Sequence, residues 1–271
     1  MPFFQHDHLH FHYQIEGSGK PIFFLHGLGG SIDQAFDVLK GLKNHQIHTL
    51  AFRGHSQTVF DGRTECLNFD TFASDFEAFL NYLDIKELVL GGISMGAGVS
   101  LNFAIRYPER VKKLILHRPA WLNKPLPEYL KMIHQMACFI EEKGIVQARK
   151  NIVKTPLFQK MKNVAPEAVD MLWQQWQNPL AGEFYPLIKH IPASIPFESF
   201  EDLKKIKCPT LVIGTGRDPI HPIHFAQKLA KEIPYAVFES TSPRYVEPEK
   251  HQREVVEKIQ LFLDKEHKQS N

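Results

Sequence analysis

The sequence is poor in cysteine, shows no surplus of one charge and contains no long apolar run. Its three cysteines, Cys66, Cys138 and Cys208, form no C-x-x-C pair, and an odd number cannot all close intrachain disulfides. A balance of 32 Lys and Arg against 30 Asp and Glu gives a net charge of +2. So small a charge offers no general attraction for nucleic acid or an anionic membrane, and we expect neither as a partner.

The sequence also lacks an apolar run of 18 residues, and its amino end lacks a basic stretch followed by an apolar one. We therefore expect a soluble, cytoplasmic protein in a reducing compartment. Histidine, in contrast, is abundant, with 15 residues. Histidines act as metal ligands, pH sensors and catalytic groups, but also occur as solvated surface residues, so the number alone decides nothing.

Short apolar runs bounded by turn residues alternate with helical patterns along much of the chain. Such runs are typical of strands that are buried on both faces of a parallel sheet. This alternation predicts an α/β fold, with a doubly wound, mostly parallel sheet and helices on both faces. The predicted strands are 21–25, 47–52, 88–90, 114–116 and 210–213, and the predicted helices are 31–43, 69–83, 95–107 and 222–233.

The amino-terminal residues alternate in polarity before a glycine-containing turn at 16–19, which predicts an antiparallel edge hairpin. Histidines occupy every second position from His6 to His12 and would share one face of a strand. They are suited either to a metal site or to the wet face of an edge strand, and we favour the second interpretation. We predict no metal and no cofactor. The apolar positions are Leu9, Phe11, Tyr13 and Ile15.

The alternation of strands and helices breaks between Arg118 and Lys207, where helical patterns at 128–142 and 167–177 are separated by prolines. We predict a helical cap insertion at 118–207. The core would then comprise residues 1–117 and 208–271.

A G-x-S-x-G motif lies at Gly92, Ser94 and Gly96, directly between a predicted strand and a predicted helix. A sharp strand-to-helix turn exposes the serine and leaves no room for side chains two residues away on either side. The free N–H groups and the dipole of the following helix point toward such a serine. We therefore predict that Ser94 is a nucleophile.

A second glycine-rich turn, His26-Gly-Leu-Gly-Gly30, also follows a strand. Acyl transfer requires donors directed at the developing oxyanion, and two neighbouring strand-to-helix turns can supply them. We assign this role to the backbone N–H groups of Leu28 and Met95. A phosphate-binding loop is the competing interpretation, but neither G-x-G-x-x-G nor G-K-[ST] is present.

Together these features resemble the α/β-hydrolase family over nearly the whole chain. The resemblance rests on the turn at 26–30, Arg53-Gly-His55, the motif at Ser94, and the segment 214–222, which contains Asp218. It implies a triad in the order Ser, Asp, His, with Asp218 as the acid. Independently, an aspartate in a turn just after a buried strand lies at the sheet edge where α/β folds bind ligands. Capping of the next helix is the alternative role for Asp218.

The general base is harder to assign, because the loop where the family usually carries its histidine, after the last strand, has none here. Chain order leaves four candidates. His221 and His224 are very close to Asp218 in the sequence, and His267 lies in a polar tail. We therefore predict His251, about one turn into a final helix that starts near Pro248. His221 or His224, or no working base at all, remain open.

The predicted function is hydrolysis of a small, apolar carboxylic ester through an acyl-enzyme. Thioesters, lactones and C–C bonds beside a ketone also fit. The alternatives are a ligand-binding or receptor-like protein with little turnover, and a cofactor-independent perhydrolase or haloperoxidase-like enzyme.

The pocket is predicted from the apolar side chains of the cap, although side chains at helical spacing more often form the cap's own core. Arg118 could meet an anionic group of a small-molecule substrate or pair with a carboxylate. His26 and His55 are expected to hold loops by hydrogen bonds. The proposed pocket residues are Arg118, Trp121, Met132, Met136 and Trp173.

Overall fold

The computed structural model describes residues 2–265 and contains a sheet of eight strands. The strand order is β1-β2-β4-β3-β5-β6-β7-β8, with β2 antiparallel to both of its neighbours and the other pairs parallel. The predicted fold class is confirmed. The strands are β1 (Phe3–His6), β2 (Leu9–Gly17), β3 (Lys20–Leu25), β4 (His45–Leu50), β5 (Leu88–Ile93), β6 (Val111–His117), β7 (Thr210–Thr215) and β8 (Ala236–Thr241).

The amino-terminal hairpin joins β1 and β2 through Asp7 and His8, whose φ angles are 48° and 65°. Two positive φ angles are typical of the tight turns that match strand twist in hairpins. The turn predicted at 16–19 leads instead to β3, and β4 lies between β2 and β3. The hairpin turn separates His6 from the histidines of β2, and among residues 2–265 no three His, Cys, Asp or Glu side chains form a group that could hold a metal.

Helices cover both faces of the sheet, because alternate strand side chains point in opposite directions. In β3, Ile22 and Phe24 pack toward α1 and α9, whereas Phe23 and Leu25 belong to the cluster with α2, α3 and α8. No helix within residues 2–265 has the length and apolarity needed to cross a bilayer. The helices are α1 (Asp33–Val38), α2 (Phe69–Tyr82), α3 (Met95–Arg106), α8 (Ile223–Glu232) and α9 (Pro248–Asp264).

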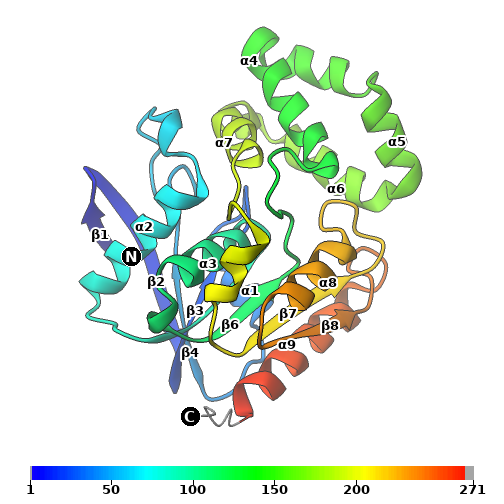
Figure 1. The fold of residues 1–271 in the computed structure, drawn as a ribbon. Helices are drawn as coiled ribbons and strands as arrows, with labels where there is room; N and C mark the ends of the chain where they lie inside the picture. Colours follow the sequence, from blue (N-terminus) through cyan, green and yellow to red (C-terminus); the bar gives the residue numbers. More distant parts are fainter. Residues whose placement is uncertain (1, 266–271) are drawn as a thin grey trace.

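The chain between β6 and β7 forms α4 (Lys131–Ile152), α5 (Pro156–Val164), α6 (Pro166–Gln177) and α7 (Tyr185–His190). Figure 1 shows α4, α5 and α6 as a group beyond one end of the sheet, far from α9. The short helix η6 (Phe200–Lys205) differs, since it contacts α3 and α8 of the sheet layer. The described part of this segment contains no strand, as the sequence predicted.

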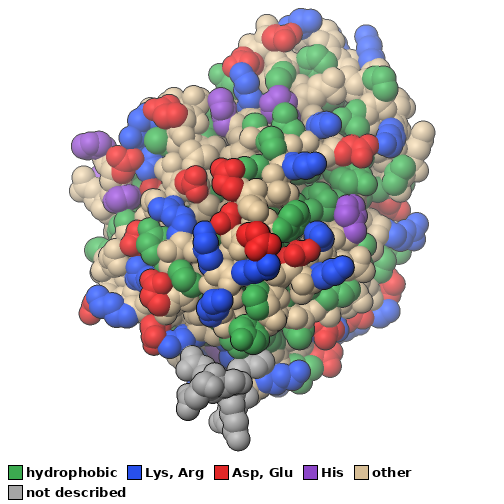
Figure 2. Space-filling model, viewed as in Figure 1, with side chains coloured by type: hydrophobic (Ala, Val, Ile, Leu, Met, Phe, Trp, Pro, Cys, Tyr) green, Lys and Arg blue, Asp and Glu red, His purple; other side chains and the backbone are tan. Residues whose placement is uncertain are grey.

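The surface carries charges of both signs, interspersed over the face seen in Figure 2, in keeping with the small net charge. Parallel strands bring their carboxyl ends to one edge of the sheet. Four loops therefore start side by side, after Leu25 of β3, Ile93 of β5, His117 of β6 and Thr215 of β7. The first three of these loops begin at His26, Ser94 and Arg118, and the fourth contains Asp218.

Candidate active site

Ser94 occupies a strained turn between β5 and α3. Its backbone has φ 56° and ψ −113°, and its N–H donates to the carbonyl of His117 at 3.0 Å. A Cβ atom on Gly92 would overlap the backbone of Gly96, and one on Gly96 would overlap the carbonyl of Leu25. The two motif glycines are therefore required by close packing of backbone against backbone. A positive φ at a serine costs roughly 1–3 kcal/mol, and such strain is typical of functional sites.

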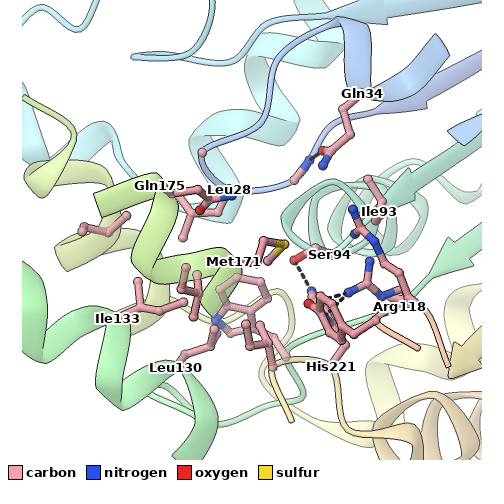
Figure 3. A pocket seen from close by; sticks show the side chains of 18 of the residues that line it. Leu28, Gln34, Ile93, Ser94, Arg118, Leu130, Ile133, Met171, Gln175 and His221 are labelled. Carbon is pink, nitrogen blue, oxygen red and sulfur yellow. Dashed lines mark hydrogen bonds between the residues drawn. The ribbon is translucent and has the colours of Figure 1, made fainter. Parts of the chain in front are cut away.

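His221 is the histidine that contacts Ser94. Its Nε2 atom lies 2.9 Å from Ser94 Oγ, and its Nδ1 atom lies 3.1 and 3.0 Å from the two carboxylate oxygens of Asp218. Figure 3 shows the imidazole beside the serine, and both residues line a pocket. A hydroxyl, an imidazole and a carboxylate thus form one continuous hydrogen-bonded chain.

The prediction that His251 lies between Ser94 and Asp218 is wrong. Residues 218–221 form a turn in which the Asp218 carboxylate also accepts the backbone N–H of His221, at 3.2 Å. The turn folds the imidazole back over the carboxylate and out toward the serine. The short spacing that argued against His221 is therefore the feature that places it.

His251 lies in the first turn of α9, as predicted, but its ring faces other partners. Its Nδ1 atom is 3.0 Å from the carbonyl of Ser242 and 3.1 Å from Thr241 Oγ1, and its ring stacks on His117 at 5.7 Å. Burial lowers the pKa of His251 to about 4. We therefore expect a neutral ring at physiological pH that ties α9 to the loop after β8.

Arg118 follows β6 and forms a buried ion pair with Asp218. Its Nε and Nη2 atoms lie 2.8 and 2.5 Å from Asp218 Oδ2, and its side chain is 1% exposed. The Tyr245 hydroxyl accepts a further hydrogen bond from Nη2 at 3.3 Å. Of the two roles considered for Arg118, pairing with a carboxylate is the one observed.

These charges set the protonation states of the chain of residues. Burial alone would raise the pKa of Asp218, but His221 and Arg118 outweigh it and hold that pKa well below its usual range. Burial lowers the pKa of His221, Arg118 lowers it further and Asp218 opposes both. Asp218 is therefore ionised and His221 neutral at neutral pH. We assign the imidazole proton to Nδ1, which faces the carboxylate, so that Nε2 accepts the hydrogen bond of the serine.

The turn at 26–30 packs against the serine, since a Cβ on Gly27 would lie 3.3 Å from Ser94 Cβ. The N–H groups of Gly27, Gly29 and Gly30 all have partners. In the described part of the chain, no hydrogen bond takes up the N–H of Leu28. Met95 is the first residue of α3, where helix N–H groups have no partner one turn earlier.

Two buried histidines fix the loops around this turn. His26 Nδ1 lies 2.9 Å from the carbonyl of Gly27, and its Nε2 accepts the N–H of Phe52 at 3.1 Å. His55 Nε2 accepts the N–H of Gly29 at 3.1 Å. Burial lowers the pKa to about 4 for His26 and to about 3 for His55, so both are neutral. The hydrogen bonds expected for these two histidines are present.

The cavity beside Ser94 has a volume of about 140 Å³ and is largely apolar on the side of α4 and α6 (Figure 3). Of the predicted pocket residues, Trp121 and Arg118 line it. Met132 and Met136 are fully buried within the helical segment instead, and Trp173 packs on Phe158. The apolar lining side chains include Leu28, Trp121, Leu130, Ile133, Met171, Leu172, Trp176, Ile188 and Ile220.

Several lining residues were missed, each for an identifiable reason. Helical spacing groups residues on a face but does not say which face meets the cavity, so Ile133 and Met171 could not be told from Met132. Tyr245 and Arg244 also line the cavity, from the loop after β8 where the sequence lacks a histidine. The available signal was that loop itself, because it opens at the same sheet edge as Ser94.

Comparison with protein families agrees with this architecture. The model of the alpha/beta hydrolase fold family matches residues 20–243.

Curated relatives match parts of the chain or most of it. It is 34% identical over 125 residues to Uncharacterized hydrolase YraK of Bacillus subtilis, covering 46% of each chain. It is 29% identical to Ethanol acetyltransferase 1 of Cyberlindnera jadinii, covering 55% of this chain and 45% of that one. In both cases the match spans less than half of the relative. Non-heme chloroperoxidase CPO-A1 of Kitasatospora aureofaciens is 28% identical over 85% of this chain and 87% of its own.

Solved structures share the fold at low identity. The enol-lactonase from Burkholderia xenovorans LB400 superposes with a TM-score of 0.75 at 17% identity, covering 97% of this chain and 100% of that one. An esterase from Exiguobacterium antarcticum gives 0.69 at 16% identity, covering 93% and 96%. Since the family model spans most of the sequence, the chain belongs to the α/β hydrolase fold family.

Proposed function

We propose that the protein is a serine hydrolase of small carboxylic esters, with Ser94 as nucleophile, His221 as general base and Asp218 as the residue that orients the base. The observation that carries the proposal is the hydrogen-bonded chain from Ser94 through His221, at 2.9 Å, to Asp218, at 3.0 Å. Nucleophile, base and orienting acid within hydrogen-bond distance are the signature of covalent catalysis by a serine.

In the acylation step, Ser94 Oγ attacks the ester carbonyl while His221 Nε2 takes its proton. Asp218 stabilises the imidazolium that forms, and the same proton then passes to the leaving alkoxide as the C–O bond breaks. The low pKa of His221 favours this sequence, because the base is neutral at the start and gives up its proton readily.

We assign the stabilisation of the negative charge that develops on the carbonyl oxygen to the backbone N–H groups of Leu28 and Met95. Two observations support this assignment: no acceptor within residues 2–265 takes up the N–H of Leu28, and Met95 lies in the first turn of α3. Removing one such donor typically costs a factor of about 100 to 1,000 in rate.

In the deacylation step, water attacks the acyl carbon while His221 removes its proton. The bond from the acyl carbon to Ser94 Oγ then breaks, His221 returns the proton to Ser94, and the carboxylic acid leaves. The cavity of about 140 Å³ favours a short acyl chain, and its apolar side favours an acyl group without charge. We further propose that residues 118–207 act as a cap that closes this cavity, since Trp121, Leu130 and Met171 line it.

The proposal is tested by measuring turnover of p-nitrophenyl acetate and butyrate together with labelling by a fluorophosphonate. We expect hydrolysis and a label on Ser94, both abolished by Ser94→Ala. A folded protein without turnover and without label would contradict the proposal and favour a ligand-binding role on the same fold.

The similarity to a non-heme chloroperoxidase over 85% of the chain favours a second candidate activity. Hydrogen peroxide in place of water would convert the acyl-enzyme into a peracid and free Ser94. Peracetic acid formation from acetate and hydrogen peroxide, lost in Ser94→Ala, would support it. Ester turnover without peracid formation would exclude it.

A further inference from the structure

Arg244 is a second arginine at the site, and the mechanism above does not use it. It lies on the loop after β8, is half-buried, and lines both the cavity beside Ser94 and an outer groove of about 640 Å³. The two spaces share a wall made of Gly29, Gln34, Ile93, Arg118, Gln175 and Arg244. Arg244 therefore borders both the space beside the serine and the outer groove.

Among residues 2–265, Arg244 has no ion-pair partner of its own. Within residues 2–265, no carboxylate oxygen lies within 4.0 Å of its guanidinium, whereas Arg118 is neutralised by Asp218. Its guanidinium lies 5.9 Å from the centre of the Tyr245 ring. Burial lowers the pKa of Arg244 and Arg118 lowers it further, while Tyr245 and Asp218 partly oppose this. The acidic residue in the lining of the outer groove is Asp37, which forms no ion pair with Arg244.

Resting on the proposed function, we propose that Arg244 binds a carboxylate on the leaving-group side of the ester. A guanidinium presents paired N–H donors that match a carboxylate, and it is less strongly hydrated than an ammonium group. A half-buried cation without a carboxylate in direct contact is a site that an anionic ligand stabilises.

The size and lining of the two spaces indicate which half of the ester carries the charge. The cavity next to Ser94 is small and apolar on its α4 and α6 side, so it suits the uncharged acyl group. The outer groove is larger and is bordered by polar side chains, including Gln34, Gln252 and His251. The substrate class is thus a short-chain acyl ester of a hydroxy acid.

The test compares 4-acetoxybenzoate with its methyl ester, which has the same acyl group and no charge. For each protein, the kcat/KM for hydrolysis of the acetyl ester of 4-acetoxybenzoate is divided by the kcat/KM for hydrolysis of the acetyl ester in the methyl ester. Comparing this ratio between the wild type and each variant cancels the difference in intrinsic reactivity of the two substrates. We expect Arg244→Gln to reduce this ratio about 10- to 100-fold, the loss typical of one charge-assisted hydrogen bond. Arg244→Glu should reduce it further, and Arg244→Lys should retain part of it.

Arg253→Gln is the matched control, because Arg253 is exposed on α9, lines neither space and carries the same charge. It should leave the ratio unchanged. Equal losses on both esters in Arg244→Gln, or an equal change in Arg253→Gln, would overturn the inference while leaving the hydrolase proposal intact. If the wild type hydrolyses neither ester, the hydrolase proposal is refuted, and this inference with it.

Discussion

Replacing Arg118 with methionine removes the buried partner of Asp218 and keeps most of the side-chain volume. The ion pair is nearly inaccessible to solvent, with side chains 1% and 0% exposed. In the variant, Asp218 keeps two donors from His221, the backbone N–H and the ring Nδ1–H, but loses the counter-charge. The perturbation therefore acts on stability and on the titration of the site together.

Removing one partner of a buried ion pair costs about 3 to 5 kcal/mol in the free energy of unfolding. Because two hydrogen bonds to Asp218 remain, we expect about 3 kcal/mol at neutral pH, a fall in melting temperature on the order of 10 °C. Arg118 holds the pKa of Asp218 down in the folded protein. The stability that this ion pair contributes is therefore complete above the pKa of about 4 that Asp218 has in the unfolded chain, and it is lost as the pH falls below that value. The difference between wild type and variant should narrow in acid.

The stability difference is largest at neutral pH, whereas the change in activity should be seen on the acid side of the pH profile. Arg118 lowers the pKa of His221, so without it that pKa rises and the acid limb of kcat/KM for a neutral ester moves to higher pH. Arg118→Lys keeps the charge and should shift the limb less. An acid limb that stays in place or moves to lower pH in Arg118→Met would refute this account of the site electrostatics.

Two further predictions concern the turn that carries Ser94. Gly96→Ala should lower the free energy of unfolding by at least about 3 kcal/mol in denaturant titration, because its Cβ meets the backbone of a central strand, whereas Gly216→Ala, where a Cβ meets nothing within 4 Å, should have little effect. Ser94→Gly should abolish turnover and raise the free energy of unfolding by about 1 kcal/mol, because glycine adopts the positive φ of 56° without strain. A lower free energy of unfolding in this variant would contradict the assignment of strain to Ser94.

Much of the fold was predictable, because burial on both sheet faces marks the parallel strands clearly. The runs at 21–25, 88–90 and 210–213 all lie inside observed strands, and the helix expected at 95–107 is α3. Ser94 and the glycines around it were predictable for the same reason, since only glycine fits between the backbones that meet there. Local sequence specifies such tight turns.

The pairing of side chains across the site was less predictable. Chain order limited the base to a few histidines, but the choice of His221 depends on a turn of four residues that folds a side chain back on its own loop. The partner of Asp218 was equally hidden, because Arg118 lies 100 residues earlier and meets it only through the adjacency of β6 and β7. Distances of this kind depend on sheet order, which the sequence pattern leaves open.

The most direct test of the central claim compares His221→Ala with His251→Ala in hydrolysis of p-nitrophenyl acetate. His221 contacts both Ser94 and Asp218, whereas His251 bonds to the loop after β8. We expect His221→Ala to lower kcat by at least about a hundredfold, as for loss of a general base, and His251→Ala to retain kcat within a few-fold with reduced stability. Retained turnover in His221→Ala, or its loss in a folded His251→Ala protein, would contradict the account.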